Sequence, residues 1–151
     1  GRVEGTTEGS LPPGTIIDDG EDGFTTTVGW NLTRVNEGRG GDVRFTGAGN
    51  GSRIATWTFT GLIPGMYRVS ATWSTNANRA TNAPYSIYDG ETLIDTVRID
   101  QRQAADDFNT QGSDWEDLME VEITGDTLVV ELSNDADGFV IADAIRVQPV
   151  T

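Results

Sequence analysis

The side chains that could do chemistry in this sequence are carboxylates, hydroxyls, amides and arginines. The chain has 24 Asp and Glu residues against 10 basic residues, all of them Arg, and it has no His and no Cys. Without His or Cys there is no Ser-His-Asp triad, no thiol nucleophile, no disulfide and no Cys-based zinc site. Without Lys there is no P-loop lysine and no Schiff base. This inventory favours recognition over covalent or proton-transfer chemistry.

Asp143 is the most informative single residue, because it lies in the apolar phase of a strand pattern. Within FVIADAIRVQ (residues 139–148) apolar side chains alternate, and Asp143 shares their phase. A carboxylate on an apolar face is costly unless it is paired or coordinated. Three interpretations are open: a Ca²⁺ site, which needs several oxygen ligands, an ion pair with a buried arginine such as Arg79, or a bulge that turns the side chain outward.

Two Asp-rich turns resemble the start of a calcium-binding EF-hand loop. They are DDGEDG (residues 18–23) and DADG (residues 135–138). The twelfth position counted from Asp18 is Gly29, and counted from Ser133 it is Ala144, whereas an EF-hand needs a bidentate Glu there. Ordinary turn chemistry explains both runs, since Asp and Gly are favoured in turns.

Aromatic and amide side chains are the candidates for contact with a sugar. Of the four Trp residues, Trp57 and Trp73 share the phase of core residues. Trp30 and Trp115 lie beside Gly, Asp and Asn, and each is either a stacking platform or a cover over one end of the fold.

The polar loop STNANRATNA (residues 74–83) carries a second set of candidates, Asn78, Arg79 and Asn82. These side chains can hydrogen-bond sugar hydroxyls, and they can equally cap turns of their own backbone. The run IDQR (residues 99–102) is a further polar cluster with the same two interpretations.

Adjacent acid pairs give no sign of a glycosidase. Asp106-Asp107 and Glu116-Asp117 are neighbours in sequence, and neighbours in an extended chain point to opposite faces. A glycosidase needs two carboxyl groups that face one scissile bond. We therefore expect a protein that is not an enzyme.

The elements that must position these side chains are short strands, because a period of two dominates the sequence. We expect a hairpin over residues 84–100 around Asp89-Gly90, a second hairpin joining residues 118–123 to 127–133, and one helical turn at most, near residues 104–108. Further strands are expected at residues 15–18, 53–59, 67–74 and 139–148, and loops at residues 19–28, 36–41, 47–52 and 75–83. Such spacing predicts an all-β fold, a single antiparallel jelly-roll β-sandwich.

Length and charge limit the classes of protein. The chain of 151 residues and 16.2 kDa suits one domain, which we place at residues 15–151 after a linker at residues 1–14. The formal net charge of −14 argues against nucleic acid and against an anionic membrane surface as partners. No apolar run is long enough to span a membrane.

Several stretches together resemble a known family. IIDDGEDGF (residues 16–24), ATWTF (55–59), NRATNAPY (78–85) and SNDADGFVIADAIRV (133–147) occur in the order found in the golvesin/xanthan-lyase C-terminal domain. The resemblance implies a galactose-binding-like jelly-roll β-sandwich that serves as an accessory domain of secreted or cell-surface bacterial proteins. Comparable families carry a structural Ca²⁺ between the first and last strands, which adds Asp18 and Asp19 to Asp143 as candidate ligands.

Two functions follow from these observations. The first is a non-catalytic accessory module that binds extracellular polysaccharide and holds an attached enzyme or surface protein near its target, with Trp30, Asn78, Arg79, Asn82 and Trp115 as candidate contacts. The second is a structural, spacer or adhesion module without a sugar site. An exposed loop Trp favours the first, whereas two buried Trp residues and no groove favour the second. The ligand is expected to be neutral or to be met by Arg, since the net charge repels polyanions.

Overall fold

The alternation of buried and exposed residues along the strands explains why the chain forms a sandwich. In β6 (Ile54–Phe59) every second residue is buried, and β12 (Leu128–Ser133), which pairs with it, repeats the pattern. Each such strand has one apolar face, which is stable only when it packs against another layer. The computed structural model describes residues 14–33 and 36–150, and these form an all-β antiparallel sandwich, as predicted.

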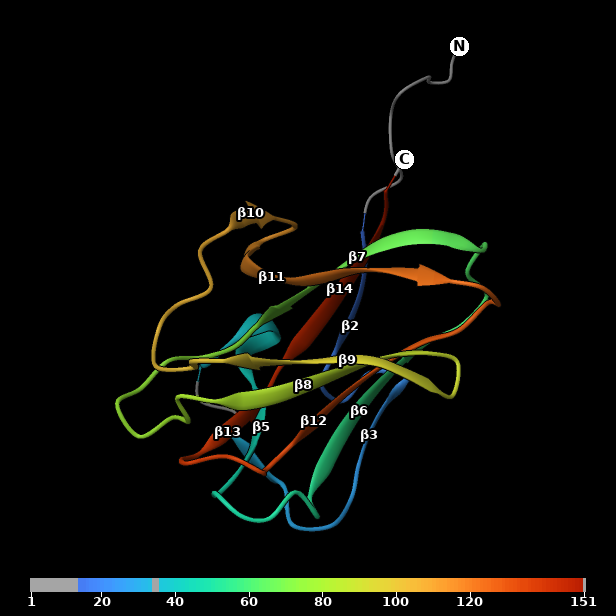
Figure 1. Cartoon of the computed structure of the whole chain (residues 1–151). Coiled ribbons are helices and arrows are strands. Elements are labelled where there is room, and N and C mark those ends of the chain that lie inside the picture. Colours follow the sequence, from blue (N-terminus) through green and yellow to red (C-terminus); the bar gives the residue numbers. More distant parts are fainter. Residues whose placement is uncertain (1–13, 34–35, 151) are drawn as a thin grey trace.

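Two five-stranded sheets make the layers, and a three-stranded sheet closes one side (Figure 1). The first sheet has the order β10 (Phe108–Thr110), β11 (Ser113–Ile123), β7 (Gly65–Thr72), β14 (Ala144–Val150), β2 (Thr15–Asp18). The second has the order β3 (Phe24–Thr26), β6, β12, β8 (Ala83–Asp89), β9 (Thr92–Ile99). The third has the order β13 (Val140–Ala142), β5 (Val43–Thr46), β4 (Asn31–Thr33).

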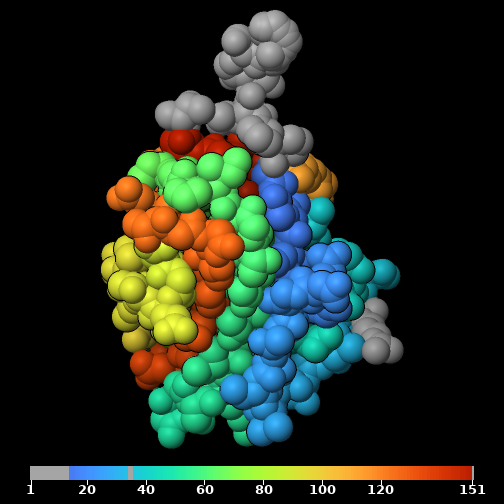
Figure 2. Space-filling model, turned by 90° about the vertical axis from the view of Figure 1, so that its right-hand side faces the viewer, coloured from blue at the N-terminus to red at the C-terminus, as the bar shows by residue number. Residues whose placement is uncertain are grey.

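The first and last described strands are neighbours. Strand β2 pairs with β14, with Thr15 opposite Val147 and Asp18 opposite Ala144. Figure 1 shows the start of β2 and the end of β14 at the same end of the sandwich, and Figure 2 shows the blue segment with β2 and β3 against the green one with β6 and β7. The opposite ends of β2 and β14 therefore also lie together, inside the fold.

The core lies between the two large sheets. Trp57 is fully buried, packs against Phe24 with ring centroids 5.2 Å apart, and donates a hydrogen bond from Nε1 to the backbone oxygen of Asp143 at 3.3 Å. Trp73 is also buried, and its Nε1 donates to the Gln103 backbone oxygen at 2.8 Å. Both residues were predicted to be core residues, and this is confirmed.

Most of the predicted strands are present, including the hairpin of β8 and β9 around Asp89-Gly90. The second predicted hairpin is wrong. Strand β11 pairs with β7 and β10, whereas β12 pairs with β6 and β8, so the turn between them crosses from one sheet to the other. Two amphipathic strands joined by a short turn can pair with each other or face each other across the core, and local pattern does not distinguish these arrangements.

The predicted helical turn near residues 104–108 is also wrong. The described helix is a short 3-10 segment, η1 (Arg39–Gly41), within a predicted loop. Gly38, Gly40 and Gly41 have φ values of 73°, 73° and 85°, a conformation that residues with a Cβ rarely adopt. Among the described residues no helix has the length and apolar character needed to cross a bilayer.

Residues 1–13 of the predicted linker lie outside the described residues. Gly14 is buried, and a Cβ built on it would lie 2.4 Å from Nε of Arg146 on β14. The described part of the chain thus enters the fold at Gly14, one residue before β2.

Candidate functional site

The structure gathers four Asp residues where β2 and β14 meet inside the fold. Asp18 ends β2, Asp19 follows it, Asp42 precedes β5, and Asp143 lies between β13 and β14. Carboxylate oxygens of Asp18, Asp19 and Asp42 lie within 4.8 Å of one another, and the carboxyls of Asp18 and Asp19 lie close enough to Asp143 to raise its pKa. We call Asp18, Asp19, Asp42 and Asp143 the acid cluster.

Asp143 enters this cluster because the last predicted strand is broken at that residue. Residues before it pair with β5 in the third sheet, and residues after it pair with β2 and β7 in the first. The backbone changes sheet at Asp143 while the side chain stays inside, with 1% of its surface exposed. The bulge that would turn it outward is therefore wrong.

Few groups satisfy the buried carboxylates. The backbone N–H of Arg39 donates to Oδ2 of Asp143 at 2.8 Å. Among the described residues, Oδ1 of Asp143 and both carboxylate oxygens of Asp19 have no hydrogen-bond partner. Nε of Arg44 lies 3.5 Å from Oδ2 of Asp19 and forms an ion pair with it, but no hydrogen bond. Buried polar atoms in folded proteins are nearly always paired, so these oxygens indicate a missing partner.

Burial sets the electrostatics of the acid cluster. Desolvation raises the pKa of Asp143, and the neighbouring Asp18 and Asp19 carboxyls raise it further. Desolvation likewise raises the pKa of Asp19, again with Asp18 adding to the effect. The pKa of Asp18 is raised by burial, although hydrogen bonds to its neighbours oppose this. Without a cation the cluster therefore retains protons at neutral pH.

The residues of the acid cluster fit a divalent metal ion. Their donors are all oxygen, the set that Ca²⁺ prefers, and three buried oxygens lack partners among the described residues. A cation there would be held by Asp18, Asp19, Asp42 and Asp143, and it would add positive charge to that of Arg44, which reaches only Asp19 in the described part of the chain. Three of these four candidate ligands, Asp18, Asp19 and Asp143, were predicted from the sequence. Asp42 was missed, because it follows a glycine-rich loop without periodicity.

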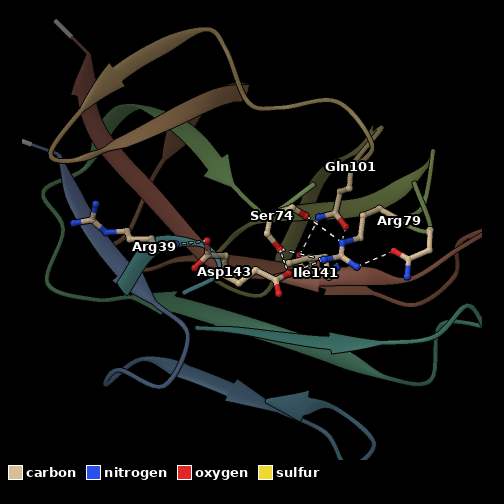
Figure 3. A network of polar contacts seen from close by, with 8 residues as sticks. Arg39, Ser74, Arg79, Gln101, Ile141 and Asp143 are labelled. Carbon is tan, nitrogen blue, oxygen red and sulfur yellow. Dashed lines mark hydrogen bonds and ion pairs between the residues drawn. The ribbon is translucent and has the colours of Figure 1, made fainter. Parts of the chain in front are cut away.

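The pairing of Asp143 with Arg79 is wrong. Figure 3 shows Arg79 reaching its own cluster, away from Asp143. Its Nη2 donates to Glu37 Oε2 at 2.6 Å and its Nε to the Ser74 backbone oxygen at 3.2 Å. Glu37, which pairs with this buried arginine, lies in the loop before η1. That loop has no strand-like alternation from which the pairing could have been predicted.

The other polar candidates of the 74–83 loop hold that loop together. Oδ1 of Asn78 accepts from Nη1 of Arg79 at 2.8 Å. Oδ1 of Asn82 accepts from the backbone N–H of Asp137 at 3.0 Å. These contacts correspond to the turn-capping interpretation of the loop, since both side-chain oxygens accept hydrogen bonds from the protein.

Gln101, from the run at residues 99–102, is a buried connector and not a surface group. It is fully buried, and Figure 3 shows it near Ile141. Its Nε2 donates to the Ile141 backbone oxygen at 2.9 Å and to the Tyr85 hydroxyl at 3.0 Å, and its side-chain oxygen accepts from the Ile141 N–H at 2.8 Å. It thereby joins the end of β9 to β13.

The two loop tryptophans are placed differently. Trp115 is fully buried in β11, and its Nε1 donates to the Thr110 backbone oxygen at 3.0 Å, so its ring offers no face to a sugar. Trp30 is half-buried against the core, and its Nε1 has no partner among the described residues. Sequence neighbours suggested a loop for Trp115, but β11 begins two residues before it.

A groove of about 830 Å³ adjoins the acid cluster. Its walls come from η1 on one side and from the turn between β10 and β11 on the other. Its lining includes Asp18, Arg39, Trp73, Thr75 and Asp114. About half of the lining residues are charged or carry a hydroxyl, and Trp73 is the one aromatic residue among those that the structure describes.

A smaller hollow of about 520 Å³ lies beside the groove and shares Trp73 and Ala104 with it. Asp106, Asp107 and Glu116, near this hollow, have carboxylate oxygens within 4.8 Å of one another. Burial and the neighbouring acids raise the pKa of Glu116. The sequence did not reveal this grouping, because Glu116 reaches the others through the pairing of β10 with β11.

The fold is that of carbohydrate-binding modules. A family 35 carbohydrate-binding module from Cellvibrio japonicus matches with a TM-score of 0.61 and 17% identity over 91% of this chain and 95% of that one. The corresponding module from Paenibacillus barcinonensis matches with a TM-score of 0.60 and 15% identity over 91% and 100%.

The chain belongs to the family described as the Golvesin C-terminal domain, which it matches over residues 15–149. A Paenibacillus xanthan lyase structure matches with a TM-score of 0.76 and 25% identity over 92% of this chain. The chain spans 13% of that lyase. No curated protein matches the chain.

Proposed function

We propose that this chain is a non-catalytic module that binds extracellular polysaccharide through the groove and keeps an attached enzyme or surface protein near its target. The groove beside the acid cluster is the observation that carries this function. A tether raises the local concentration of the attached protein, so weak binding to each sugar unit is sufficient. Secretion to the cell exterior is part of the proposal.

Several observations support the proposal. The fold is shared with carbohydrate-binding modules, and xanthan lyase and a Podospora anserina mannanase described as carrying a family 35 module contain similar domains within longer chains. The groove provides polar groups around Trp73. The sequence contains no His, Cys or Lys for nucleophilic or acid–base work beyond carboxylates.

Calcium is the cation that we propose for the acid cluster. The ion would connect the end of β2 to the start of β14, at the opposite end of the pair from the chain termini. Its role is structural, since Asp19 and Asp143 are buried and leave little room for a ligand at the ion. The same ion would hold the wall of the groove that contains Asp18.

A substitution that fills the groove tests the sugar site. Thr75 is exposed and lines the groove, whereas Thr60 is exposed on a turn that does not line it. We expect Thr75→Arg to lower retention on an array of neutral polysaccharides by about tenfold or more, the effect of losing roughly 1.4 kcal/mol. Thr60→Arg, which makes the same change in charge, should bind like the parent chain.

The test has a clear opposite outcome. If the parent chain binds no glycan on the array in the presence of Ca²⁺, the sugar-binding function is wrong. If Thr75→Arg binds as well as the parent chain, glycans bind elsewhere.

A structural or adhesion role is the second candidate. It is favoured by Trp115, which is fully buried, and by the loop side chains of Asn78 and Asn82, which contact the protein. The glycan array separates the two functions, because a spacer binds no sugar.

A further inference from the structure

The segment Gly38–Gly40 rests directly on the acid cluster. The Arg39 N–H donates to Oδ2 of Asp143 at 2.8 Å. A Cβ on Gly38 would lie 2.6 Å from that same oxygen, and one on Gly40 would lie 2.7 Å from Oδ2 of Asp18. The backbone therefore approaches both carboxylates as closely as glycine allows, and a shift of either carboxylate must move this segment.

The Arg39 side chain extends from this segment to the other wall of the groove. Figure 3 shows it pointing away from Asp143. Its Nη1 donates to the Gln111 backbone oxygen at 2.5 Å and to Oγ of Ser113 at 2.9 Å. Its Cζ lies 5.9 Å from the ring centroid of Trp115, within the range of a cation–π contact. One residue thus joins the acid cluster to the turn between β10 and β11.

That turn is a part of the fold that depends on side-chain contacts. Strands β10 and β11 pair over three residues on each side, and β10 is the edge strand of its sheet. Gln111 has a φ of 52°, which is unusual for a residue with a Cβ. Its Oε1 accepts from Nε of Arg146 at 2.8 Å. A short edge pair of this kind opens more readily than the central strands.

We propose that Arg39 couples the cation at the acid cluster to the shape of the groove. A bound cation fixes Asp18 and Asp143, these fix the backbone of Gly38–Gly40, and the Arg39 guanidinium then holds the β10–β11 turn as the far wall. The inference rests on the proposed cation and groove. The coupling is reciprocal. If calcium raises the affinity for a ligand that needs the ordered wall, that ligand raises the affinity for calcium by the same factor.

Amide hydrogen exchange of residues 109–114 tests this coupling without any sugar. In the parent chain, adding Ca²⁺ to chelator-treated protein should slow exchange of these amides by about fivefold or more, the low end of typical coupling between sites. In Arg39→Ala the affinity for Ca²⁺ should stay within about threefold, since the backbone N–H to Asp143 remains, but the slowing in residues 109–114 should disappear.

Two further variants keep the test sharp. Arg68→Ala removes a half-exposed arginine on β7 that does not line the groove, and it should keep the full calcium response. Ser113→Ala removes one acceptor of Arg39 and leaves Arg39 itself intact, so it should weaken the calcium response. It provides the test if Arg39→Ala fails to fold.

Two results would overturn the coupling. Calcium that binds the parent chain but leaves exchange of residues 109–114 unchanged shows that the cation and the turn are independent. A full response in Arg39→Ala and Ser113→Ala shows that another contact carries it. A chain that couples calcium to the turn but binds no glycan refutes only the sugar-binding function.

Discussion

Asp143 is a residue whose burial destabilises the fold unless its carboxylate is protonated or bound to a cation. It lies in the apolar phase of a strand, fully inside, with one carboxylate oxygen that has no partner among the described residues. An uncompensated buried charge is strongly destabilising, so in metal-free protein the carboxyl keeps its proton. A cation bound there would replace that proton and would connect β2 to β14.

The raised pKa values of Asp19 and Asp143 predict how the stability of metal-free protein depends on pH. The folded state keeps protons on these carboxyls that the unfolded chain releases above about pH 4. The contribution of these carboxyls to the free energy of unfolding is therefore highest below that pH, and it falls as the pH rises toward the pKa values of the folded state. Each of these carboxyls that keeps its proton should lower the melting temperature of chelator-treated protein by about 3–6 °C per pH unit as the pH rises from 5 to 7.

Calcium should reverse this trend, because it binds the deprotonated carboxylates. At 100 times its Kd it adds about 2.7 kcal/mol of stability, which is roughly 5–10 °C for a domain of this size. Asp143→Asn should flatten the pH dependence and reduce the calcium effect, whereas Asp22→Asn, an exposed residue outside the acid cluster, should change neither. A melting temperature that rises with pH after chelation, or that ignores Ca²⁺ at pH 7, contradicts the prediction.

At the scale of single residues, the sequence predicted what strand phase can report. It placed Trp57 and Trp73 in the core, which the structure confirms, and it put Asp143 in an apolar phase with an outward bulge left open, which the structure excludes. It could not supply Asp42 or Glu37, because both lie in loops whose contacts depend on tertiary structure. Arg39 went unnoticed for the same reason, since one arginine between glycines has no pattern.

At the scale of elements, Gln101 connects the second large sheet to the third sheet. It is fully buried and makes three hydrogen bonds, two of them to the backbone of Ile141. Gln101→Ala would leave the Ile141 N–H buried without an acceptor, and each such group costs about 1–3 kcal/mol.

We therefore expect Gln101→Ala to lower the melting temperature by about 5–10 °C in a thermal denaturation experiment, from a loss near 3 kcal/mol. Gln103→Ala is the matched control, since its side chain is exposed and its contacts to Trp73 and Asp100 use the backbone. Equal melting temperatures for the two variants would mean that water replaces the buried amide at no cost.

The elements also mark the limit of local pattern. The β8–β9 hairpin could be predicted because Asp89-Gly90 marks its position, although Asp89 pairs with Thr92 and the loop itself is Gly90-Glu91, with a φ of 58° at Gly90. The split of residues 139–148 into β13 and β14 could not, since apolar alternation continues through Asp143. Only the pairing partners, β5 before the break and β2 and β7 after it, place the two halves in different sheets.

At the scale of the whole molecule, the net charge of −14 limits which glycans can approach. A charge of one sign repels polyanions over about a Debye length, which is roughly 10 Å at 0.1 M salt and 30 Å at 0.01 M. With every carboxylate ionised and one Ca²⁺ bound, the formal net charge of −14 becomes −12, so the repulsion remains with the cation in place. Arg39 is the only basic residue among those that line the groove in the described structure.

Ionic strength should therefore separate neutral from anionic polysaccharides. In affinity gel electrophoresis with 1 mM Ca²⁺, a neutral glucan or mannan should retard the chain equally in 10 mM and 150 mM NaCl, whereas polygalacturonate should retard it less at 10 mM, where repulsion is screened least. Thr60→Arg and Thr75→Arg each make the net charge one unit less negative, so only the groove variant should lose retardation in the neutral gel. Stronger retention by polygalacturonate at 10 mM than at 150 mM would show that local cationic groups, Arg39 or a bound Ca²⁺, dominate over the charge of the whole domain.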